Sequence, residues 1–161
     1  MARNARKWFA LICSIILYYI IHEGAHVVAA LLLGTFQRIR IVGFGLGVQV
    51  VANTTAMSNV QLFIFCIVGA IATLVVGYVL VLRRQNLLKN KNKVVRAVGY
   101  YATLVFLMVD PIYLSVLHNF VGGGDMNRIT QMGISPLLLG VWAERAALSD
   151  RVQTEPREAH A

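Results

Sequence analysis

Two histidines and a glutamate stand close together near the start of the chain. The sequence HEGAH at 22–26 lies within an apolar run over 8–33 that carries no other charged residue. On an α-helix, positions i and i+4 face the same side, so His22 and His26 can bind one metal ion. Glu23 can then reach a water molecule held by that metal. This is the H-E-x-x-H spacing of zinc hydrolases.

The apolar run around this motif is long enough to cross a lipid bilayer. At a rise of about 1.5 Å per residue it exceeds the roughly 30 Å thickness of the hydrocarbon core. A charged group at the centre of a membrane helix costs about 2.5 to 3.5 kcal/mol on insertion scales, and such groups persist mostly with partners. A metal ion is one such partner. A polar cluster that joins helices, or a proton relay, is the alternative explanation.

The composition is that of a polytopic membrane protein. Hydrophobic residues make up 58% of the 161 residues, well above the share in ordinary soluble domains. The net charge of +8 comes from basic residues that flank apolar runs and anchor helices at the cytoplasmic leaflet. We therefore expect a lipid bilayer and no nucleic acid as a partner. Cys13 and Cys66 lie inside apolar runs and are interpreted as small core residues.

These patterns predict an all-α polytopic membrane protein, with one core over residues 1–148 and a disordered polar tail over 149–161. About four transmembrane helices are expected, and their approximate ranges are 8–33, 60–82, 98–120 and 129–148. Glycines and a proline make the fourth irregular.

The segment 35–58 departs from the helical pattern. Its side chains alternate around a glycine-rich break at 43–47, which predicts a small membrane-associated β-hairpin. The segment 83–96 carries basic residues and no acid, and is predicted to be a polar cytoplasmic loop. By the positive-inside rule the N-terminus and this connector face the cytoplasm, and the hairpin faces the other side.

Two aspartates are candidates for a third zinc ligand, because catalytic zinc generally takes three protein ligands. Asp110 lies near the middle of the predicted helix 98–120 and is within reach of His22. Asp125 follows that helix in a glycine-rich segment whose backbone could dip back into the membrane. Geometry alone leaves both open.

The order of these motifs resembles the site-2 protease family of intramembrane zinc metalloproteases. The resemblance covers about residues 15–130: an H-E-x-x-H helix, a hairpin, a helix with a small-residue motif from Gly69 to Thr73, and a late aspartate in a glycine-rich turn. From the sequence alone, the small residues of 60–82 are interpreted mainly as helix-packing positions.

The resemblance also implies a ligand set. In the family the late aspartate, in a motif close to Asp-Gly-x-x-Ile, is the third zinc ligand, and the segment 124–129 matches this motif in part. It implies that Zn2+ is bound by His22, His26 and Asp125, with Asp110 as the rival to Asp125.

We therefore expect a zinc metalloendopeptidase that hydrolyses peptide bonds in or near transmembrane segments of membrane-protein substrates, as in regulated intramembrane proteolysis. Glu23 would take a proton from zinc-activated water and pass it to the leaving amine. Because a substrate helix must unwind locally, the hairpin at 36–52 could pair with the extended segment as an added strand. The sequence does not indicate an oligomeric state.

Two other functions stay open. One is a non-proteolytic zinc-binding membrane protein. The other is a metal or proton transporter, which is disfavoured because the run over 60–82 has almost no polar side chains to line a pathway.

Overall fold

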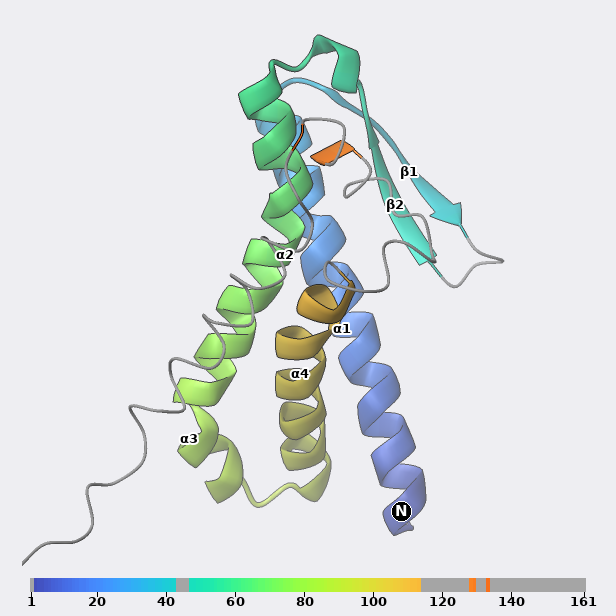
Figure 1. Cartoon of the computed structure of the whole chain (residues 1–161). Coiled ribbons are helices and arrows are strands. Elements are labelled where there is room, and N and C mark those ends of the chain that lie inside the picture. The colour runs from blue at the N-terminus through green and yellow to red at the C-terminus, as the bar shows by residue number, and fades with distance from the viewer. Residues whose placement is uncertain (1, 43–46, 114–127, 130–132, 134–161) are drawn as a thin grey trace, which may run out of the picture. The chain divides into compact units, whose positions relative to one another are not determined.

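The computed structural model describes residues 2–42, 47–113, 128–129 and 133 (Figure 1). Residues 1–110 form one compact unit, which holds the contacts discussed below. Of the second unit, Pro111–Ala161, only 111–113, 128–129 and 133 are described.

The described residues are mostly helical. Three helices are long and apolar enough to cross a membrane: α1 (Arg3–Leu32), α2 (Asn59–Leu82) and α4 (Lys93–Ile112). Two strands, β1 (Phe36–Val42) and β2 (Gly47–Ala52), pair antiparallel beside α1 (Figure 1). The short helices η1 (Thr54–Ala56) and α3 (Arg84–Lys89) complete the elements. This architecture is consistent with the predicted membrane helices and hairpin.

Three predictions about local structure are wrong. The long helices α1 and α4 begin at Arg3 and Lys93, several residues before the apolar runs that marked them. The basic connector 83–96 is also no simple loop, because it contains α3. Lysine, arginine, leucine and glutamine are good helix formers. The helical backbone can therefore continue beyond the apolar segment into the basic residues that flank it. The predicted fourth helix, 129–148, lies outside the described residues except for 129 and 133.

Helix α2 starts with a capping box, and its bounds agree with the prediction to within one residue. The side chain of Ser58 accepts a hydrogen bond from the Gln61 backbone, and the Gln61 side chain accepts one from the Ser58 backbone. Two otherwise unsatisfied N–H groups are thereby paired at the start of an apolar helix.

The outer faces of the long helices carry many exposed apolar side chains. On α2, side chains such as Val60, Ile71 and Val75 are at least half exposed. The buried side of the same helix holds Gly69 and Thr73 instead. A soluble protein rarely exposes so large an apolar surface, so this distribution is consistent with an integral membrane protein.

The inward positions of each helix repeat every four residues, which places them on one face. They are Ala10, Ser14, Tyr18, His22, His26 and Ala30 on α1, Phe65, Gly69, Thr73 and Gly77 on α2, and Ala102, Phe106 and Asp110 on α4. In the view of Figure 1, α4 lies between the lower parts of α1 and α2.

The hairpin has one apolar and one polar face. Cross-strand partners Ile39 and Val50 share a face, and Arg40 pairs with Gln49 on the other. Val50 is buried, whereas Ile39 and Ile41 are more than half exposed. Val50 contacts α1 through its backbone N–H, whereas the side chains of Ile39 and Ile41 on the same apolar face remain exposed.

Gly77 lets α2 approach α4 closely, which yields a testable prediction. A Cβ at this position would lie 2.7 Å from Leu107 Cδ2 and 3.3 Å from Phe106 Cβ. Gly77→Leu should therefore overpack the contact and destabilise the protein by about 1–3 kcal/mol. Thermal unfolding in detergent micelles should show a midpoint several degrees lower, whereas Val75→Leu on the exposed face of α2 should leave it unchanged. Equal midpoints for the two variants would contradict the close approach.

Candidate metal centre

Helix α1 presents the two histidines of the motif toward α2. Their ring centroids lie 5.1 Å apart, as expected for residues one turn apart on one face. His26 is buried with its ring 5.0 Å from that of Phe65, and His22 is half-buried with 17% of its side chain exposed. The apolar environment excludes most solvent from this pair.

Gly69 of α2 lies where the two imidazoles converge. A Cβ added there would be 2.6 Å from His26 Nε2 and 2.7 Å from His22 Nε2. Both Nε2 atoms therefore approach one small region beside the α2 backbone. This region is open because glycine has no side chain. Two imidazole nitrogens that converge in this way fit a zinc ion, for which nitrogen ligands lie about 2.0–2.1 Å away.

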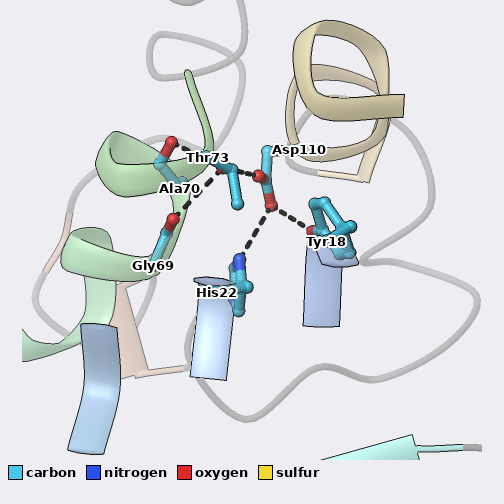
Figure 2. Close-up of polar contacts among 6 residues, drawn as sticks. All are labelled: Tyr18, His22, Gly69, Ala70, Thr73 and Asp110. Atoms are coloured by element: carbon cyan, nitrogen blue, oxygen red, sulfur yellow. Dashed lines mark hydrogen bonds and ion pairs between the residues drawn. The ribbon is translucent and has the colours of Figure 1, made fainter. Parts of the chain in front are cut away.

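The other nitrogen of His22 faces Asp110 of α4. Nδ1 lies 3.4 Å from Asp110 Oδ1, and the hydroxyl of Tyr18 donates a hydrogen bond of 2.6 Å to the same oxygen (Figure 2). The hydroxyl of Thr73 donates to the second oxygen, Oδ2. The carboxylate, which is 1% exposed, thus has partners from α1 and α2.

Thr73 connects this carboxylate to the glycine of α2. Its Oγ1 also lies 3.1 Å from the carbonyl oxygen of Gly69 and 2.9 Å from that of Ala70 (Figure 2). A threonine hydroxyl has one proton, and an ionised carboxylate is a stronger acceptor than a carbonyl. We therefore assign the proton to the bond with Asp110.

Glu23 lies on the hairpin side of α1. Its Oε2 accepts a hydrogen bond of 3.1 Å from the backbone N–H of Val50 in β2. Because that N–H is used by Glu23, it points away from β1 and toward α1. The edge of β2 therefore faces the helix that carries the motif.

The structure brings together some of the predicted site residues and not others. His22 and His26 face one point, with Glu23 adjacent, but Asp110 approaches the Nδ1 side of His22 rather than the Nε2 side. Asp125 lies outside the described residues. Within the described part of the chain, no three His, Cys, Asp or Glu side chains are grouped closely enough to hold a metal ion.

Sequence reasoning assigned no site role to Tyr18 and interpreted Gly69 and Thr73 mainly as packing residues. The signal that could have found them is the four-residue repeat. Tyr18 precedes His22 by one turn, and Thr73 follows Gly69 by one turn on a helix that is apolar over most of its length. Polar or small residues at this spacing mark one face of each helix.

Comparison of the chain with protein-family models, with curated proteins and with solved structures finds no match.

The space beside Gly69 can be tested with one methyl group. Gly69→Ala should push both imidazoles away from their common point and weaken zinc binding at least about tenfold, as altered support of metal ligands typically does. Gly24→Ala is the matched control, because a Cβ at Gly24 meets nothing within 4 Å. Zinc affinity is measured by chelator competition on detergent-purified protein. Unchanged affinity in Gly69→Ala would contradict a metal position beside Gly69.

Proposed function

We propose that the protein is an intramembrane zinc metalloprotease similar to the site-2 protease family. The observation that carries the proposal is the convergence of His22 Nε2 and His26 Nε2 beside Gly69, inside helices with apolar outer faces. Two such nitrogens with a glutamate one residue away are the arrangement that metal-assisted hydrolysis uses.

Each residue of the motif has a role in this proposal. His22, His26 and Asp125 would hold Zn2+, which supplies an activated water and polarises the scissile carbonyl when bound. Glu23 accepts the proton of the attacking water and delivers it to the leaving amine. The surrounding apolar residues exclude bulk water, which strengthens the electrostatic interactions inside the site.

The hairpin offers a way to present an extended substrate. The β2 edge faces α1 at Val50, and the N–H of Val50 donates to the carboxylate of Glu23. A substrate strand added along this edge would replace Glu23 as the partner of the Val50 N–H and would lie next to the released carboxylate. Membrane-protein substrates fit this proposal, because the outer faces of α1 and α2 are suited to lipid and a substrate helix can approach within the bilayer.

The role of Glu23 is tested by Glu23→Gln. The amide keeps an oxygen that can accept the Val50 N–H, so the hairpin contact survives, but it cannot take up a proton. Zinc should remain bound, and cleavage of transmembrane peptides in proteoliposomes should fall by about 10²–10⁴-fold. Glu155→Gln makes the same change in the C-terminal segment and should leave cleavage unchanged.

Mass spectrometry of a library of apolar peptides, each with a central Gly-Pro pair that weakens its helix, gives the readout. Cleavage that survives in Glu23→Gln would refute the proposed mechanism. Zinc-loaded wild type that cleaves no member of the library would favour a non-proteolytic zinc-binding protein.

The ligand set is tested by metal content. Detergent-purified wild type, expressed with ample zinc, should hold about one zinc per chain, and His22→Ala, His26→Ala and Asp125→Ala should each lose it. His160→Ala removes a histidine outside the motif and should keep the metal. Inductively coupled plasma mass spectrometry measures the ratio, and full zinc in Asp125→Ala would exclude that residue as the third ligand.

A further inference from the structure

We propose that Asp110 is a positioning residue: it holds the His22 ring through Nδ1 so that Nε2 is directed to the metal position beside Gly69, and it is not itself a ligand. The inference rests on the proposed metal site. It follows from the side of the ring that the carboxylate occupies.

The two nitrogens of His22 face different partners. Nε2 points to the space beside Gly69, and Nδ1 lies 3.4 Å from Asp110 Oδ1. A carboxylate at Nδ1 favours the tautomer with the proton on that nitrogen. The lone pair then lies on Nε2, where a metal can use it. Carboxylates that orient a metal-binding histidine in this way are a general feature of zinc sites.

Both oxygens of Asp110 are already in use. Oδ1 accepts the hydroxyl of Tyr18 at 2.6 Å, and Oδ2 accepts the hydroxyl of Thr73. To reach a metal at Nε2 of His22, the carboxylate would have to extend from the Nδ1 side past the imidazole ring, against its hydrogen bonds to the two hydroxyls. The hydrogen bonds therefore favour support of the ring over ligation.

Tyr18 adds a second constraint on the same imidazole. Its ring stacks on that of His22, with centroids 5.4 Å apart and an interplanar angle of 30°. The ring of Phe106 in turn packs edge-on against Tyr18 at 6.0 Å. The imidazole is thus held at one face by an aromatic ring and at one edge by a carboxylate. Helical spacing alone would not fix its orientation.

Thr73 connects α2 to the contacts that hold the His22 ring. Its hydroxyl donates to Asp110, and its own helix carries Gly69 one turn earlier. The Thr73 hydroxyl therefore orients the carboxylate that in turn orients His22. Thr73 belongs to α2, the helix that borders the proposed metal position. A shift of α2 or α4 would alter the direction of the His22 lone pair.

The experiment compares Asp110→Asn and Asp110→Ala with wild type, using cobalt(II) alone as a spectroscopic probe in full-length, detergent-purified protein. We expect one cobalt per chain at saturation, an unchanged visible absorption spectrum, and affinity lowered by about 10–100-fold. Loss of the cobalt site, or a spectrum altered by a changed ligand set, would mean that Asp110 is a ligand. Affinity equal to wild type would mean that the carboxylate only joins the helices. Either result overturns the inference.

Threonine variants supply a matched pair that keeps the carboxylate in place. Thr73→Val removes the donor to Oδ2, and affinity for cobalt should fall at least about threefold, within the effects seen for outer-shell partners. Thr103→Val on α4 makes the same change at a hydroxyl that donates 2.8 Å to the Gly99 carbonyl and to no site residue in the described structure. It should leave affinity unchanged. Equal affinities for the two variants would overturn the inference, even if the Asp110 variants fail to fold.

A metal-free measurement separates this inference from the proposed function. In ¹⁵N spectra of metal-free wild type, His22 should carry its proton on Nδ1, and in Asp110→Ala the population should shift toward the Nε2 tautomer. The same tautomer in both proteins would overturn the positioning role. If wild type shows the expected tautomer but binds no cobalt, the metalloprotease proposal fails, while the orientation of His22 by Asp110 stands.

Discussion

The packing of the three long helices depends on one constraint: the carboxylate of Asp110 is buried away from water, so polar partners must replace its hydration. A buried ionised group is costly unless partners replace its hydration. Here the partners come from two other helices, since Tyr18 and His22 belong to α1 and Thr73 to α2. Within lipid, apolar surfaces gain little by contacting each other rather than the acyl chains. Polar contacts of this kind therefore specify which faces of α1, α2 and α4 meet.

Small residues set how closely those faces meet. Gly77 allows Leu107 of α4 to approach the α2 backbone, and Gly69 leaves room for two imidazole rings of α1. Both glycines lie on the same side of α2, two turns apart, with Thr73 between them. This row of residues on α2 thus allows close helix packing at Gly77 and borders the candidate metal centre at Gly69. A helix of larger apolar residues would fill this space and displace the histidines.

The backbone N–H of Val50 links the hairpin to the motif on α1. Because Val50 N–H bonds Glu23 and not β1, the edge of β2 is directed at the helix that carries both histidines. Under the proposed function, the strand that would bind an extended substrate and the carboxylate that would act as base lie in direct contact. The position of the substrate and the proton transfer by Glu23 would then both depend on how β2 lies against Glu23.

Much of the fold follows from local patterns in the sequence. The hairpin and α2 are predicted closely, because alternation around glycines and an uninterrupted apolar run are properties of neighbouring residues. The starts of α1 and α4 and the short helix α3 are missed, because hydrophobicity marks the membrane segment and not the whole helix. The i, i+4 spacing likewise places His22 and His26 on one face without any tertiary information.

What the sequence by itself determined is therefore the three apolar helices α1, α2 and α4, the hairpin, and the pairing of the two histidines with Glu23. Only the tertiary structure decided that Asp110 meets Nδ1 rather than Nε2 of His22, and that Gly69 borders both Nε2 atoms. These contacts join residues far apart in the chain. They depend on how each helix is rotated about its axis, which is set by the side chains it packs against and not by its own periodicity.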